Sequence, residues 1–146
     1  MAEGVACPLC KPRPASNHEW DFVAALGASS LYLNRNQTYR GHCLLIFDPR
    51  HAARPDELSE PEWASFCADL FRAQGAIMRT VHADHINIEA LGNVVPHLHW
   101  HIVPRYRNDP RWGAPIWAAA ELMRNTSLGE DGQSALIEEL RRALGI

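Results

Sequence analysis

The stretch His97-Leu98-His99-Trp100-His101-Ile102-Val103 decides what fold and chemistry to expect of this chain. Its polar and apolar residues alternate, and successive side chains of an extended strand point to opposite faces. The three imidazoles are therefore predicted to share one face, with Leu98, Trp100 and Ile102 on the other. Because imidazole serves near neutral pH as acid, base, nucleophile or metal ligand, this face is the candidate site.

The segments around this stretch predict an α+β domain. Ser59-Glu60-Pro61-Glu62 has the form of a helix capping box, and apolar residues follow at helical spacing, which predicts a long helix over 60–83. A terminal helix is predicted over 133–144, ending before Gly145. We expect an antiparallel sheet of about five strands with helices on one face. Strands are predicted at 21–26, 29–34, 42–47, 85–91 and 97–103.

Composition favours one compact domain over 1–146, with an N-terminal arm (1–18) and a C-terminal tail (107–146). The chain has 146 residues, 47% hydrophobic and 21% charged. Its net charge of -3 offers no basic footprint for nucleic acid. The first residues lack the basic and apolar regions of a signal peptide, and no apolar run is long enough to cross a bilayer. A cytoplasmic protein with no membrane partner is the expectation.

A row of histidines on a strand has two main chemical uses. The imidazoles can converge on one metal ion, or a neutral imidazole can attack phosphorus and form a phosphoramidate that water later cleaves. Gly92 and Asn93, just before the histidines, would let a ligand approach the backbone and would offer an amide donor. The residues alone leave both uses open.

The histidine stretch with its flanks resembles the histidine triad (HIT) family of nucleotide hydrolases and transferases. The resemblance extends from Asn34 through Arg105 and includes the segment 34–42, which ends in Gly41-His42. The run Val103-Pro104-Arg105-Tyr106 is similar to members that cleave dinucleoside polyphosphates. The resemblance therefore implies a HIT-like fold and a nucleotide substrate.

The resemblance also implies roles for single residues. His99 would be the nucleophile that takes the nucleotidyl group at its α-phosphate, and His101 would contact the phosphate and help protonate the leaving group, with His97 as the third triad member. Asn93 stands where the family often has Gln. The substrate-binding residues implied are Asn34, His42 and Asn93.

The spacing Cys7-Pro8-Leu9-Cys10 is that of half a zinc site, which needs two further ligands. In zinc-bearing relatives of the family, the cysteine pair joins a histidine after the central strand and the first triad histidine. The resemblance thus implies a structural zinc ion on Cys7, Cys10, His51 and His97. Four protein ligands would leave that ion no open position.

For several residues near the triad, the sequence is compatible with two different roles. Arg105, Arg107 and Arg111 would attract a polyphosphate tail or form a solvated basic loop. Trp112 and Trp117 would stack on a base or pack in the core or an interface.

The leading functional hypothesis is a nucleotidyl hydrolase acting on a dinucleoside polyphosphate through a covalent nucleotidyl-histidine, as a homodimer. The alternatives are a nucleoside phosphoramidase or nucleotidyl transferase of the same family, an idle nucleotide-binding module, and a metalloenzyme with one ion on the three triad histidines.

Overall fold

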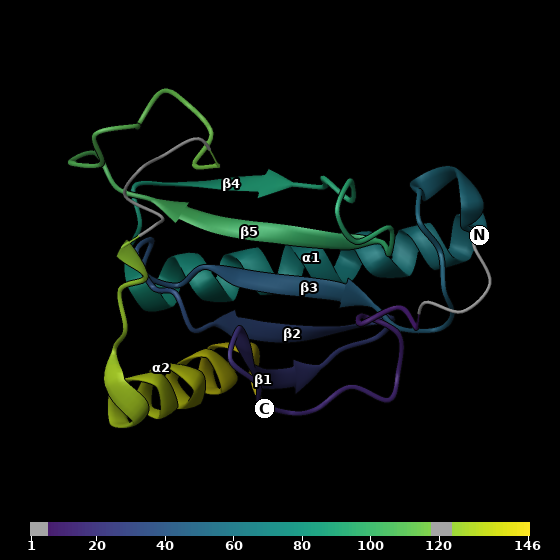
Figure 1. The fold of residues 1–146 in the computed structure, drawn as a ribbon, viewed down its shortest axis with the longest axis horizontal. Helices are drawn as coiled ribbons and strands as arrows, with labels where there is room; N and C mark the ends of the chain where they lie inside the picture. Colours follow the sequence, from purple (N-terminus) through teal and green to yellow (C-terminus); the bar gives the residue numbers. More distant parts are fainter. Residues whose placement is uncertain (1–5, 118–123) are drawn as a thin grey trace.

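The computed structural model describes residues 6–117 and 124–146, which form one antiparallel sheet with two helices (Figure 1). The five strands lie in the order β1-β2-β3-β5-β4, as predicted for an α+β fold. Residues 1–5 of the expected arm and 118–123 of the expected tail lie outside the described residues. The strands are β1 (Trp20–Ala25), β2 (Ser29–Asn34), β3 (Cys43–Phe47), β4 (His85–Glu89) and β5 (His99–Arg105).

The long helix α1 (Glu60–Val81) follows a 3-10 turn, η1 (Pro55–Glu57), and begins at the predicted capping box. The Ser59 side chain accepts a hydrogen bond from the Glu62 N–H, and the Glu62 carboxylate accepts one from the Ser59 N–H. The helix ends two residues earlier than predicted, because His82 takes a left-handed conformation (φ 52°) and caps it.

The C-terminal helix α2 (Gly129–Leu144) begins four residues before the predicted start at 133. Gly129 and Gly132 lower the helix propensity of the residues before 133. The helix extends because its apolar face, with Leu136 and Leu140, is buried against the rest of the core. Tertiary packing therefore overrides the local preference.

The helices cover one face of the sheet, as Figure 1 shows for α1. Alternate residues of the strands, such as Leu45 of β3 and Ile102 of β5, join Phe66 and Ile77 of α1 in the main core. The predicted apolar face of the histidine stretch is confirmed. Leu98 and Ile102 are buried in this core and Trp100 packs against it. Neither helix in the described part of the chain combines the length and hydropathy that a membrane-spanning segment needs.

The predicted strand over 97–103 is wrong at both ends, since β5 runs from His99 to Arg105. His97 lies before the strand, where its N–H donates to the Val95 carbonyl at 2.8 Å and the chain turns. Pro96 favours such a break, because proline lacks the N–H that a ladder needs. The three histidines therefore do not line a single strand face.

The other face of the sheet is partly covered by the N-terminal arm. Leu9 packs there in a smaller apolar cluster with Trp20, Tyr32, Leu44 and Ile46. The neighbouring part of this face carries His99 and His101, which pair in register with Ile46 and Leu44 of β3. The arm thus leaves part of the sheet open to a cavity.

The buried Arg13 side chain fixes the arm to the sheet. Its guanidinium donates to the Asp48 carboxylate at 2.5 Å, to the Tyr32 hydroxyl at 3.1 Å and to the Leu9 carbonyl at 2.5 Å. Burial opposes the charge on Arg13, but the hydrogen bonds that it donates to Asp48 and Tyr32 hold its pKa above the ordinary value. The arm is consequently ordered by contacts within the chain itself.

Candidate active site and metal cluster

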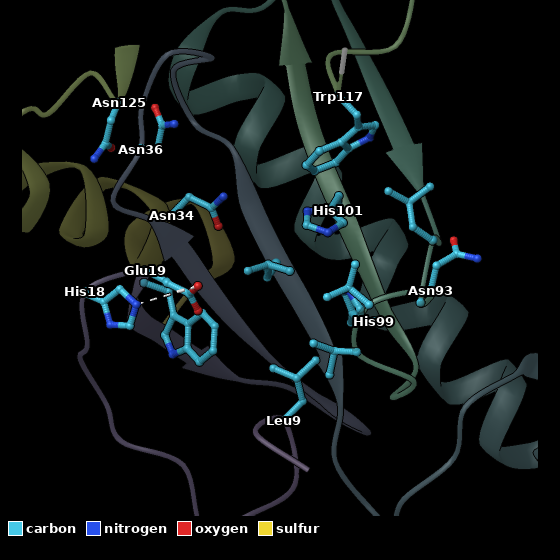
Figure 2. Close-up of a pocket in the computed structure, with 16 residues that line it drawn as sticks. Leu9, His18, Glu19, Asn34, Asn36, Asn93, His99, His101, Trp117 and Asn125 are labelled. Atoms are coloured by element: carbon cyan, nitrogen blue, oxygen red, sulfur yellow. Dashed lines mark ion pairs between the residues drawn. The ribbon is translucent and has the colours of Figure 1, made fainter. Parts of the chain in front are cut away.

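A cavity of about 600 Å³ opens on the sheet face that carries His99 and His101 (Figure 2). Polar side chains from the segment before β1, from β2 and from the loop after β2 lie across from the two imidazoles, and apolar side chains form much of the remaining wall. A cavity that is mainly apolar with a few convergent polar groups is typical of a small-molecule site. Its lining residues are Leu9, His18, Glu19, Trp20, Asn34, Asn36, Leu44, Leu91, Gly92, Asn93, Val94, Val95, His99, His101, Trp117 and Asn125.

The orientation of His99 is fixed by the backbone. Its Nδ1 donates to the His97 carbonyl at 2.5 Å, so the proton of the neutral ring sits on Nδ1. The Nε2 lone pair is then free, and the His99 side chain lines the cavity. An imidazole held in this tautomer is prepared to act as a nucleophile.

His101 belongs to a chain of hydrogen bonds with His42 and Asn34. Asn34 Nδ2 lies 3.2 Å from His42 Nδ1, and His42 Nε2 lies 3.2 Å from His101 Nδ1. The Asn34 amide nitrogen is a donor that lies nearer to His42 Nδ1 than to His42 Nε2, which is 3.4 Å away, so His42 Nδ1 accepts and His42 Nε2–H donates to His101. This order leaves the proton of neutral His101 on Nε2, the ring nitrogen available to a ligand.

Both histidines of this chain are held neutral. Burial lowers the pKa of His42 to about 3, helped by the nearby His101. Burial likewise lowers the pKa of His101 to about 4, helped by the nearby His99. His101 therefore presents a neutral N–H donor to the cavity at physiological pH.

A second cluster lies beside the cavity, where Cys7, Cys10, His51 and His97 converge. Their ligand atoms all lie within 4.8 Å of one another. Cys7 Sγ is 3.5 Å and Cys10 Sγ is 3.6 Å from His97 Nδ1, and Cys10 Sγ is 3.4 Å from His51 Nδ1. A tetrahedral zinc ion with ordinary bond lengths needs S···N separations of about 3.6 Å, so the donor set fits that ion.

The tautomer of His97 also fits metal binding. Its Nε2 donates to the Phe47 carbonyl at 2.7 Å, which leaves the Nδ1 lone pair facing the cysteines. A ligating histidine commonly donates its other N–H to a carbonyl in this way. The structure thus brings together all four predicted metal ligands, and it sets His97 apart from the cavity lining.

The predicted substrate-binding residues take different positions. Asn34 lines the cavity, and its Oδ1 is buried without a hydrogen-bond partner among the described residues. His42 is buried behind His101 rather than in the lining. Asn93 is exposed at the cavity rim, and its role stays a prediction.

Arg105 does not serve the cavity as a polyphosphate contact. Its side chain is 2% exposed and forms an ion pair with Asp109 at 2.7 Å. It also donates to Asn87 Oδ1 and to the carbonyls of Arg111 and Ala114. These hydrogen bonds tie the 106–117 loop to β4 and β5, so the sequence-based option of a basic tail-binding group fails for Arg105.

Sequence reasoning missed much of the cavity wall opposite the triad. His18, Glu19, Trp20 and Asn36 line it, yet they come from the strand β1, its approach and a turn, with no motif of their own. For Trp117 the sequence left base stacking and burial open. The structure places Trp117 in the lining, with its ring centroid 4.5 Å from that of His101.

Comparison with known families decides where the chain belongs. Residues 17–108 match the family model described as the HIT domain. The chain belongs to the HIT domain family. It is 31% identical over 119 residues to Adenylylsulfatase HINT3 of Arabidopsis thaliana, a match that takes in 77% of this chain and 56% of that protein. This HIT chain thus spans little more than half the length of that relative.

Solved structures with the same fold include several bacterial HIT proteins. A histidine triad protein of Bradyrhizobium japonicum has a TM-score of 0.78 at 27% identity, covering 86% of this chain and 91% of that one. One from Marinobacter aquaeolei has a TM-score of 0.77 at 22% identity, covering 87% and 90%. A Zn-bound histidine triad family protein of Mycobacterium smegmatis has a TM-score of 0.60 at 23% identity, covering 85% and 83%.

Proposed function

We propose that this protein hydrolyses a nucleotidyl compound at its α-phosphate through a covalent adduct on His99. The observation that carries the proposal is the Nδ1–H of His99 bonded to the His97 carbonyl, which directs the Nε2 lone pair to the cavity. Nε2 attacks phosphorus, and the bond to the leaving group breaks with its electron pair. Water then attacks the same phosphorus, releases the mononucleotide and restores neutral His99.

The neighbours of His99 supply hydrogen bonds to this reaction. The Nε2–H of His101 donates to a phosphate oxygen or to the leaving atom, and the Asn34–His42 chain keeps that proton in place. The unpartnered Oδ1 of Asn34 accepts from a nucleoside hydroxyl, and exposed Asn93 bonds a phosphate oxygen. His97 supports the site through its carbonyl and not through its ring.

For the leaving group, the family resemblance favours a dinucleoside polyphosphate. A second class, with a small or amine leaving group, is supported by two observations. The HIT relative from Arabidopsis thaliana is named an adenylylsulfatase. In addition, the cavity lining contains no lysine or arginine within residues 6–117 and 124–146.

We also propose that the cysteine–histidine cluster holds a structural zinc ion. The four donors are Cys7, Cys10, His51 and His97, and the separations fit tetrahedral coordination. The bound ion would supply a cross-link between the arm and the start of β5, with no part in the chemistry. A cytoplasmic homodimer remains the predicted form, and light scattering of the pure protein tests the dimer.

The test of the proposed reaction is a quench experiment. Purified protein is mixed with labelled adenosine 5′-phosphoramidate, adenylyl sulfate or diadenosine tetraphosphate and stopped with alkali, in which a phosphoramidate survives. We expect a protein-bound nucleotide that is absent in His99→Ala. Turnover without an alkali-stable adduct would show instead that water attacks directly.

A further inference from the structure

A glutamate lies next to the cavity of His99, on the His101 side, behind the lining residue Trp117. Glu89 of β4 is the register partner of His101 in β5, and directly paired residues of antiparallel strands share a face. Its carboxylate accepts a hydrogen bond from Trp117 Nε1 at 2.6 Å. Figure 2 shows Trp117 next to His101, whereas Leu9 lies on the opposite side of His99.

Trp117 connects this carboxylate to the reacting groups. Its ring stands edge-on to His101, with centroids 4.5 Å apart and planes at 69°, and its centroid lies 6.0 Å from that of His42. The indole is 40% exposed, so it can contact a ligand as well. Because the Trp117 N–H donates to the Glu89 carboxylate, the two side chains together form one wall beside His101.

The same pair separates two cavities on this face of the sheet. Trp117 lines the cavity of His99, whereas Glu89 lines a second one of about 510 Å³ with Arg105 and Trp112. The Arg105 charge is matched by Asp109 at 2.7 Å, and the Arg107 guanidinium lies over the Trp112 ring at 5.2 Å. The carboxylate of Glu89 forms no ion pair among the described residues.

We propose that the Glu89–Trp117 pair selects against polyanionic leaving groups and so determines the substrate class. A chain of phosphates leaving past His101 meets a carboxylate, and the described residues of the cavity lining include no lysine or arginine to offset the repulsion. An uncharged or cationic amine meets no such penalty, and a single sulfate lies between these extremes. This inference rests on the proposed nucleotidyl transfer to His99.

The test compares three adenylyl substrates that differ only in the leaving group: adenosine 5′-phosphoramidate, adenylyl sulfate and diadenosine tetraphosphate. Glu89→Gln keeps an acceptor for Trp117 and removes the charge. We expect kcat/KM to rise about tenfold for diadenosine tetraphosphate and about threefold for adenylyl sulfate, and to fall for the phosphoramidate. Trp117→Phe keeps a ring and the charge but removes the hydrogen bond that holds the carboxylate beside His101, so it should change the ratios in the same direction by a smaller factor.

The matched control is Glu138→Gln on α2, which removes the same charge from an exposed ion pair with Arg141. A folded Glu89→Gln protein whose three kcat/KM values keep their ratios within twofold overturns the inference. If the wild-type protein turns over none of the substrates, the proposed reaction fails instead. The inference is then decided by calorimetry in the His99→Ala background, where Glu89→Gln must strengthen binding of ATP about tenfold relative to AMP.

Discussion

His97 and His99 are separated by one residue, yet they belong to regions of different chemistry. The His97 ring donates to the Phe47 carbonyl and turns its Nδ1 to Cys7 and Cys10. The His99 ring donates to the His97 carbonyl and leaves its Nε2 to the cavity. The role of each imidazole therefore depends on which ring nitrogen donates to a backbone carbonyl, because the other nitrogen keeps the lone pair.

His99→Ala should have the largest effect on turnover, and it tests whether the roles of His97 and His99 are separate. We expect turnover to fall by at least about a thousandfold, since the nucleophile is removed. Metal content and the melting temperature should stay close to wild type, because the cysteine cluster uses other residues. Steady-state kinetics, metal analysis and calorimetry on one preparation measure all three, with exposed His85→Ala as the matched control.

Near wild-type kcat in the His99→Ala protein would remove the proposed mechanism. Loss of metal together with activity would contradict the separation of the two regions.

The next largest effect should come from changing the cysteine–histidine cluster. Cys7→Ser with Cys10→Ser should abolish binding of one zinc ion per chain and destabilise the fold by several kcal/mol, because binding energy contributes to folding. We expect kcat to fall by less than tenfold, since Arg13 and Asp48 still hold the arm. Elemental analysis and thermal unfolding with and without chelator check this.

The control for the cysteine pair is Cys67→Ser, a half-buried cysteine of α1 outside the cluster. A wild-type protein that holds no metal and keeps its stability in chelator would refute the zinc site.

The sequence predicted the sheet, both helices and the four residues of the cysteine–histidine cluster, since periodicity, the capping box and the family resemblance mark them. It did not predict that β5 begins at His99, because the alternation of residues continues through His97 while the backbone does not. Nor did it predict the burial of Arg105, because its partners Asn87 of β4 and Asp109 of the following loop come together only in the folded protein. Contacts between segments without a motif, such as Trp117 with Glu89, have no signal in one sequence.

A smaller effect is expected from Gly41→Ala, which tests the His42 side of the comparison. Gly41 has φ +92°, and an added Cβ would lie 2.9 Å from Val81 Cγ1. We expect a loss of about 1–3 kcal/mol in stability and a lower kcat, because the next residue is His42. Zinc content should not change. Gly113→Ala, which meets nothing within 4 Å, is the control, and equal stability of the two variants would contradict the strain.

The smallest effect is on the pH dependence of stability, which depends on His42 and not on the cysteine–histidine cluster. The pKa of His42 is lowered to about 3 by burial, against an ordinary value of about 6.5 in the unfolded chain. Below pH 6.5 the unfolded state therefore binds a proton that the folded state does not, so stability is lost as pH falls from 6.5 toward 3. At pH 5.5 this loss is about 1 kcal/mol for one imidazole.

His42→Asn removes the titrating ring, so its stability should decline less steeply than that of the wild-type protein between pH 7 and pH 5.5. Urea unfolding of both proteins in chelator measures the slopes without proton-linked release of metal. Parallel slopes would mean that His42 is protonated as readily in the folded protein as in the unfolded chain, and the neutral chain from Asn34 to His101 would then be wrong.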